Sequence, residues 1–366
     1  MGFKCGIVGL PNVGKSSLFN ALTESSNAEA ANYPFATIEP NIGRVPVSDE
    51  RLEKLSNITK SKNTIPAYLD VIDIAGLVKG ASVGEGLGNK FLAHIREMDA
   101  IIHVVRCFEN SDIVHTSPSI NPIKDIEIIE TELKLADIET LQNITNNLNK
   151  KSKGGDKEII RQLNIINALM EKFNDHHPLS FKDWSTSEMQ MISDLNLITH
   201  KPMLYVCNVD EKSIAIGNKL SDLVQEKNIS ENKHSVLVSA AIESQIVQFD
   251  NEKDKLELLK ELQLKQTTLK KVVNVGYNIL NLITFFSSTS KETRAWTIKK
   301  NTKANKAAGK IHSDFEKGFI KAEIMSYSDF MLFRGEAGCR EAGRLRKEGK
   351  DYNVQDGDII NFLFNV

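Results

Sequence analysis

The residues most suited to chemistry are two glycines and a lysine–serine pair at fixed spacing near the start of the chain. Residues 9–16 read Gly-Leu-Pro-Asn-Val-Gly-Lys-Ser, which is the spacing of a phosphate-binding loop. The apolar residues 4–8 predict a buried strand before the loop, and residues 17–23 predict the opening of a helix after it. In that setting backbone N–H groups point at phosphates. We therefore predict a nucleoside triphosphate site in which Lys15 contacts the β- and γ-phosphates and acts in catalysis, while the Ser16 hydroxyl binds Mg²⁺.

Three further residues are predicted to complete the metal and phosphate site. Residues 69–73 form an apolar run that ends in Asp73, and Gly76 follows three residues later. We expect Asp73 to hold Mg²⁺ through a water molecule, and the amide of Gly76 to contact the γ-phosphate. Thr37 lies between the two motifs and is the expected switch threonine that completes the Mg²⁺ shell. The predicted phosphate-binding residues are Asn12, Val13, Gly14, Lys15, Ser16, Ser17 and Gly76.

The segment after Gly76 is unusually rich in glycine. Five of the thirteen residues 76–88 are glycines. Such a segment is costly to order, and therefore suits a loop that is ordered only when triphosphate is bound. Leu77 occupies the position at which Ras-type enzymes carry a water-orienting glutamine. Since leucine cannot orient water, hydrolysis must be slow or must use another group.

The base-binding residues are predicted at the ends of two later strands. Residues 203–208 end in Asn208 and continue to Glu211, so the pattern is Asn-x-x-Glu rather than the Asn-Lys-x-Asp of guanine readers. The altered acid weakens the argument for guanine, leaves the base preference open and favours ATP. The predicted base-binding residues are Asn208, Val209, Glu211, Ser239, Ala240 and Ala241.

A parallel sheet is needed to bring these loops together. Apolar runs at 3–8, 68–73, 100–105, 202–207 and 235–239 alternate with helical patterns. This alternation predicts an α/β fold: a P-loop G-domain with a doubly wound, mostly parallel sheet, formed by residues 1–124 and 201–276. We expect it to close with one helix over about 253–275, on which Leu256, Leu259 and Leu262 share a face.

Residues 125–200 have a different period and are predicted to be an inserted domain. Apolar residues recur at three and four residues on both sides of a Gly-Gly pair. This pattern predicts an antiparallel helical hairpin, a coiled coil with arms of about 20–25 residues that reach on the order of 35 Å. Basic residues gather at its tip, which is either a solvated turn or a contact for RNA phosphate or a partner. They are Lys150, Lys151, Lys153, Lys157 and Arg161.

Residues 277–366 are predicted to form a small mixed sheet wrapped on a helix. Strand-like runs lie at 281–286, 293–298, 318–324 and 358–364, with a helix near 303–313. This arrangement is consistent with a β-grasp fold. A stripe of lysines is either solvated surface or a contact with RNA phosphate. Its members are Lys299, Lys300, Lys303, Lys306 and Lys310.

The composition is that of an ordinary globular chain of 366 residues, with 41% hydrophobic and 26% charged residues. A net charge of −2 excludes a global basic field that would recruit nucleic acid. The four cysteines have no metal-ligand spacing and are expected to be buried thiols. The chain begins with a strand and has no run of ~20 apolar residues. We expect a cytoplasmic monomer without membrane contact.

The phosphate loop, residues 73–92 and Asn208-Val-Asp-Glu211 together resemble the YchF/Obg-like ATPase family, and the last 90 residues resemble the TGS domain of that family. The resemblance implies a nucleotidase that prefers ATP, associates with ribosomes or ribosomal RNA, and regulates translation or the stress response. It also implies that His115 orients the attacking water, and that Asn12 places K⁺ beside the phosphates. From the residues alone, His115 is equally well a solvent-exposed loop residue and Asn12 a simple turn residue.

The leading hypothesis is a Mg²⁺-dependent molecular switch that binds and hydrolyses ATP, and also GTP if the base pocket admits it. One alternative is a slowly hydrolysing, ATP-gated adaptor for protein partners, which Leu77 equally fits. Another is a guanine-specific GTPase of ribosome assembly, which Glu211 opposes. The order of Thr37, Asp73 and Asn208 argues against a metabolic kinase.

Overall fold

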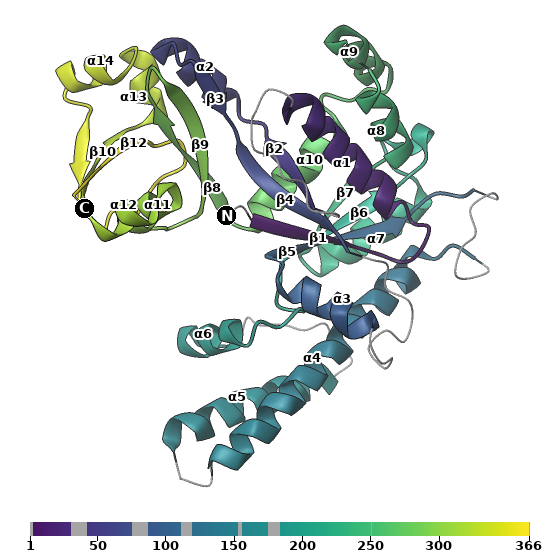
Figure 1. Cartoon of the computed structure of the whole chain (residues 1–366). Helices are drawn as coiled ribbons and strands as arrows, with labels where there is room; N and C mark the ends of the chain where they lie inside the picture. The colour runs from purple at the N-terminus through teal and green to yellow at the C-terminus, as the bar shows by residue number, and fades with distance from the viewer. Residues whose placement is uncertain are drawn as a thin grey trace.

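Two six-stranded sheets organise the chain, and a pair of long helices projects away from them (Figure 1). The computed structural model describes residues 3–30, 42–74, 87–110, 119–152, 156–174, 184–249 and 251–365. None of the helices in these ranges is long and apolar enough to cross a lipid bilayer.

The first sheet has the order β2-β4-β1-β5-β6-β7. All neighbouring strands are parallel except β2, which runs antiparallel to β4. All seven residues of β5 are buried, as expected for a strand covered on both faces. The strands are β1 (Phe3–Val8), β2 (Ile42–Val47), β4 (Ala67–Asp73), β5 (Ala100–Arg106), β6 (Met203–Asn208) and β7 (His234–Val238).

Helices cover both faces of this sheet, so the predicted doubly wound fold is confirmed (Figure 1). The helices α1 and α10 lie over one face, and α3, α4 and α7 lie over the other. Strand β2 and the helix α2 after it were not predicted. The helices of this part are α1 (Lys15–Ala30), α2 (Glu50–Thr59), α3 (Leu87–Arg96), α7 (Lys219–Ser230), α8 (Ala240–Val247), α9 (Glu252–Glu261) and α10 (Thr268–Ile279), with a short 3₁₀ helix, η1 (Glu211–Ser213).

The single helix expected over 253–275 is wrong, because two helices occupy that stretch. Gln263 has a φ of 57°, a left-handed conformation that ends α9, and the amide of Leu264 turns back to the carbonyl of Leu259 at 2.8 Å. A new helix then starts at Thr268, where the Thr267 side chain caps the amide of Lys270. Leu256 is exposed on α9 rather than sharing a buried face with Leu259.

The inserted helices α4 (Pro122–Ser152) and α5 (Lys157–Asn174) run antiparallel, as predicted, and α6 (Thr186–Asp194) packs beside them (Figure 1). At 31 residues α4 spans roughly 46 Å, longer than the predicted arms. It is longer because its first turns also belong to the core of the first sheet, through Ile129, Leu133 and Ala136. A separate apolar cluster holds the hairpin together, and it includes Leu141, Leu169, Phe173 and Ile192.

The second sheet has the order β11-β10-β12-β8-β9-β3, and the helix α11 packs on its inner face through Ala307 and Ala308. This confirms the predicted mixed sheet on a helix. Its strands are β3 (Asn63–Ile65), β8 (Leu282–Ser288), β9 (Glu292–Lys299), β10 (Phe319–Met325), β11 (Arg346–Glu348) and β12 (Ile359–Phe364). Its helices are α11 (Ala304–Ile311), α12 (Ser313–Lys317), α13 (Tyr327–Leu332) and α14 (Glu336–Glu341).

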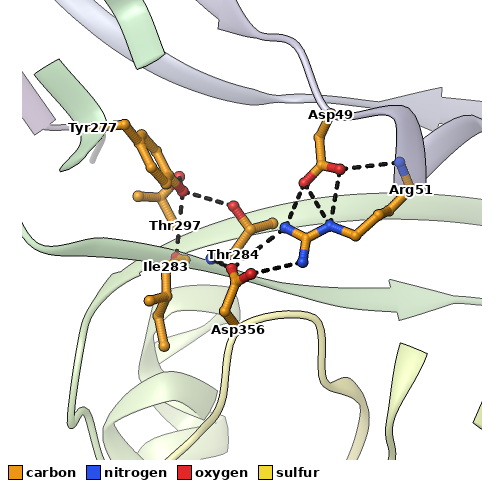
Figure 2. A network of polar contacts seen from close by, with 7 residues as sticks. All are labelled: Asp49, Arg51, Tyr277, Ile283, Thr284, Thr297 and Asp356. Carbon is orange, nitrogen blue, oxygen red and sulfur yellow. Dashed lines mark hydrogen bonds and ion pairs between the residues drawn. The ribbon is translucent and has the colours of Figure 1, made fainter. Parts of the chain in front are cut away.

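Strand β3 comes from the first part of the chain but adds to the second sheet, parallel to β9. Figure 2 shows a polar network at the same junction. Arg51 donates to the carboxylate of Asp49 at 2.8 Å and to that of Asp356 at 2.7 Å. Asp356 also accepts the amide of Thr284 at 2.9 Å. The two sheets are therefore joined by backbone pairing as well as side chains, while the domain boundaries themselves stay a prediction.

Candidate functional site

The phosphate loop connects β1 to α1, and its backbone geometry explains its glycines. Gly14 has a φ of 98°, and a Cβ there would lie 2.3 Å from the side-chain nitrogen of Asn208. A Cβ at Gly9 would lie 2.5 Å from the carbonyl oxygen of Val104. Asn12 adopts a left-handed φ of 61°, which asparagine tolerates better than most residues. The loop is thus wound as an anion-binding loop requires.

Lys15, the first residue of α1, lies within this wound loop with only 9% of its surface exposed. Its ammonium donates to the carbonyl of Leu10 at 3.2 Å. Burial lowers the pKa of Lys15, and the nearby carboxylate of Asp73 opposes that shift. A partly desolvated ammonium gains most from an anionic ligand such as a phosphate.

The predicted Mg²⁺ ligands Ser16 and Asp73 meet beside Lys15. The Ser16 hydroxyl donates to Oδ2 of Asp73 at 3.4 Å. The other carboxylate oxygen, Oδ1, is buried with no hydrogen-bond partner among the described residues. Burial raises the pKa of Asp73, and the Lys15 charge and the Ser16 hydrogen bond oppose the rise. An unpartnered carboxylate oxygen beside a hydroxyl is a hard oxygen donor set, so these residues fit Mg²⁺.

At the base end, Asn208 connects the two sides of the site. Its amide donates to the carbonyl of Val13 at 2.9 Å and accepts from the amide of Ala240 at 3.1 Å. Both polar ends of this side chain, which is 5% exposed, are therefore bound to backbone. Asn208 holds the phosphate loop against the start of α8. It therefore connects the phosphate end of the site to the predicted base end through the backbone groups that it binds.

One cavity of about 610 Å³ brings the two predicted ends together. It is lined by most of the predicted site residues, namely Asn12, Gly14, Lys15, Ser16, Ser17, Asn208, Val209, Glu211, Ser239, Ala240 and Ala241. Val13 is buried and contributes its carbonyl to Asn208. The sequence reasoning missed five lining residues: Phe108, Glu109, Asn110, Asp210 and Ser244. The position of residues 108–110, directly after a parallel strand, is the signal that could have found three of them.

The two acids after Asn208 have different surroundings. Oδ1 of Asp210 accepts the amide and the hydroxyl of Ser213 at 3.0 and 2.9 Å, and so caps η1. Glu211 is exposed at the cavity. Across from them, Ser239 is fully buried, and its hydroxyl has no partner among the described residues. Exposed Glu211 and buried Ser239 are thus two of the polar side chains that line this end of the cavity.

Five predicted residues fall outside the described ranges: Thr37, Gly76, Leu77, His115 and, at the hairpin tip, Lys153. Their expected roles in holding Mg²⁺, contacting the γ-phosphate and orienting water stay predictions. Among the described residues there is no group of three or more histidine, cysteine or acidic side chains that could hold a metal ion. A Mg²⁺ site built on only one carboxylate and one hydroxyl relies on the nucleotide phosphates for further ligands.

Comparison with known proteins adds family membership to this geometry. A family described as 50S ribosome-binding GTPase matches residues 4–151, and the YchF-GTPase C-terminal family, described as a protein of unknown function (DUF933), matches 282–365. The chain is 50% identical to the ribosome-binding ATPase YchF of Escherichia coli O157:H7 and 47% identical to that of Bacillus subtilis, over the full length of each pair. A solved structure of the Schizosaccharomyces pombe YchF GTPase matches with a TM-score of 0.89 at 40% identity, covering 99% of this chain and 98% of that one. The chain therefore belongs to the YchF family of P-loop nucleotidases.

Proposed function

We propose that this protein is a Mg²⁺-dependent nucleotidase that binds and hydrolyses ATP, and whose bound nucleotide controls its association with the ribosome. The observation that carries the proposal is the single cavity that joins Lys15, Ser16 and the phosphate loop to the wall made by Phe108 and Val209. Its 610 Å³ volume lies within the usual range for small-ligand sites. The bacterial relatives are named ribosome-binding ATPases, and this type of activity agrees with the proposal.

Each described residue of the phosphate end has a distinct task in this proposal. The Lys15 ammonium holds the β- and γ-phosphates and offsets their charge. The hydroxyl of Ser16 and the free oxygen of Asp73 would hold Mg²⁺, with Thr37 as the proposed third protein group. When bound, Mg²⁺ neutralises charge that develops between the β- and γ-phosphates. Asn12 as a K⁺ ligand and His115 as the water-orienting group belong to the same proposal.

The base end favours adenine in this proposal. Guanine readers use the aspartate of Asn-Lys-x-Asp to pair with two donors of the base. Here Glu211 stands at that position, three residues after Asn208, and is one methylene longer, while its neighbour Asp210 is occupied as a helix cap. The unpartnered hydroxyl of Ser239 is a donor and acceptor that suits the N6 amine and ring nitrogen of adenine equally. Phe108 and Val209 supply apolar surface for either purine.

The ribosome contact is assigned to the inserted hairpin. Lys150, Lys151, Lys157 and Arg161 are exposed near its end, and Arg161 also donates to the hydroxyl of Ser187 at 2.7 Å. Since the whole chain has a charge of only −2, a local basic end is the means by which it can meet RNA phosphate. A cytoplasmic location follows from that partner.

Equilibrium binding to nucleotide-free protein tests the proposal, with Mg²⁺ and K⁺ present and with ATP and GTP compared. Lys15→Ala should abolish binding, whereas the matched control Lys4→Ala, on the strand before the loop, should leave it unchanged. Turnover is then measured with and without ribosomes. ATP binding at least about tenfold tighter than GTP, or about 1.4 kcal/mol, is expected. Tighter GTP binding would favour a ribosome-assembly GTPase, and negligible turnover under all conditions would favour the ATP-gated adaptor.

A further inference from the structure

Residues 107–110 form the part of the cavity wall that carries Phe108, and they belong to no helix or strand. An irregular segment holds a shape only if its backbone groups are bound by something else. At Cys107 both groups are bound: its amide donates to the carbonyl of Asn208 at 2.8 Å, and its carbonyl accepts from the side chain of Asn218 at 2.8 Å. The carbonyls of Phe108 and Asn110 are bound by a single side chain.

That side chain is Arg106, the last residue of β5. Its Nε donates to the carbonyl of Phe108 at 3.3 Å, and its Nη2 donates to the carbonyl of Asn110 at 3.1 Å. The guanidinium carbon lies 4.7 Å from the centre of the Phe108 ring. The guanidinium therefore binds the backbone at two points of the wall and also stacks against its aromatic side chain.

Arg106 is 1% exposed, which is rare for an arginine and requires compensation. Burial lowers its pKa, and the carboxylate of Asp125, in the first turn of α4, opposes that shift. The guanidinium is thus compensated inside the protein by the two wall carbonyls and by the Asp125 charge, and its fork of donors is in use.

We propose that Arg106 is a positioning residue that fixes the Phe108 wall of the cavity, and that it thereby sets the affinity of the cavity for a purine base. The inference rests on the proposed function of the cavity as a nucleotide site. Lysine cannot replace arginine here, because one ammonium cannot reach two carbonyls in a fixed plane and stack on a ring at once.

The test compares three ligands by calorimetry on the full-length, nucleotide-free protein: ATP, GTP and inorganic tripolyphosphate, each with Mg²⁺. Arg106→Lys keeps the buried charge and should weaken ATP binding and GTP binding each by about tenfold, or ~1.4 kcal/mol. Tripolyphosphate has no base and occupies only the phosphate loop, so its affinity should not change. The matched control is Arg96→Lys, at an arginine that is only partly buried but also donates to a backbone carbonyl, that of Ala136 at 3.1 Å. It should leave all three affinities unchanged.

Chemical rescue separates positioning from general damage to the fold. Arg106→Ala leaves a space of guanidinium shape, and millimolar guanidinium, below denaturing concentrations, should restore ATP affinity while the same concentration of ammonium does not. Unchanged ATP and GTP affinities in Arg106→Lys would overturn the inference, as would an equal loss of tripolyphosphate affinity. Absence of ATP binding by the unmodified protein would instead overturn the proposed function.

Discussion

Replacing Asn208 with alanine should weaken nucleotide binding, even though both polar ends of this side chain bind the backbone rather than the nucleotide. The side chain joins the carbonyl of Val13 to the amide of Ala240, at 2.9 and 3.1 Å, in a place where only 5% of Asn208 is exposed. Removing it leaves one buried acceptor and one buried donor unpaired. At about 1–3 kcal/mol for each unsatisfied group, the free energy of unfolding should fall by roughly 2–6 kcal/mol.

Asn208→Asp is the more informative variant, because it removes only one of the two bonds. The carboxylate still accepts the amide of Ala240, but it cannot donate to the carbonyl of Val13, and it brings two oxygens into repulsion there. We therefore expect the phosphate loop to lose its support while the start of α8 keeps its own. The affinity for tripolyphosphate, which reports the loop alone, should fall by about tenfold or more, since a hydrogen-bond loss of this kind exceeds 1.4 kcal/mol.

Chemical denaturation measures the change in the free energy of unfolding, and calorimetry measures the change in tripolyphosphate affinity. The control is Asn218→Asp, which makes the same amide-to-carboxylate change at another asparagine. Asn218 lies at the N-terminus of α7, and its side chain donates to the carbonyl of Cys107. That variant should leave tripolyphosphate affinity intact. If Asn208→Asp binds tripolyphosphate as tightly as the unmodified protein does, the argument that Asn208 supports the phosphate loop is wrong.

Three other predictions concern the metal, the domain junction and pH. Asp73→Asn should lower turnover by about tenfold or more while Mg²⁺-free nucleotide binding persists, because it removes the carboxylate proposed to hold Mg²⁺ beside Ser16; steady-state kinetics against Mg²⁺ concentration check this. A double-mutant cycle of Arg51→Ala and Asp356→Asn should give a coupling energy of about 0.5–1 kcal/mol in denaturation, since the pair is partly exposed; additive effects would show that it contributes nothing. Burial lowers the pKa of His103 to about 4, below the value of 6.5 in the unfolded chain. The unfolded chain therefore binds more protons between these values, so the free energy of unfolding should fall by about 1.4 kcal/mol for each pH unit from 6.5 towards 4. His103→Leu should remove that part of the slope, and an unchanged slope would refute the assignment.

The phosphate and metal end could be predicted from sequence because its chemistry is local. A loop that binds phosphates needs glycine where a Cβ would clash, and Gly9 and Gly14 occupy such positions. The acid needs only to end a neighbouring parallel strand, and β4 ends at Asp73 next to β1. Spacing along the chain is therefore enough to place these groups.

The base-side wall and the domain junction could not be predicted in the same way. Phe108 has no motif around it, and its place depends on Arg106, whose buried role is invisible in a run of apolar residues. Strand β3 has only three residues, Asn-Thr-Ile, with no apolar run, and it exists because β9 offers it a parallel partner more than two hundred residues later. Both features are decided by tertiary contacts rather than by local pattern.

The junction formed by β3 has a consequence for how the two added parts can respond to the nucleotide. Only Pro66 separates β3, in the second sheet, from β4, which ends at Asp73 in the first sheet. The C-terminal sheet is therefore connected to Asp73, the acid proposed to hold Mg²⁺, by one extended stretch, secured by Arg51 and by hydroxyl contacts such as Ser61 to Thr293 at 2.7 Å. Moving this sheet independently would break backbone pairs as well as side-chain bonds.

The inserted hairpin, α4 and α5, is attached differently, through apolar packing of the first turns of α4 and through side-chain bonds. Beyond its packing, its polar links are side-chain bonds: Arg96 at the end of α3 donates to the carbonyl of Ala136 and to Thr140, and Asp137 accepts the amides of Ile198 and Thr199 at 2.9 and 2.8 Å. Under the proposed function, in which Gly76 contacts the γ-phosphate, α3 would connect that contact to the hairpin, because α3 follows Gly76 in the chain and its Arg96 binds α4. Side-chain links can exchange partners without breaking a sheet. Under the proposed function, a nucleotide-dependent change would therefore reach the hairpin through side-chain bonds, whereas the C-terminal sheet is held by backbone pairing as well.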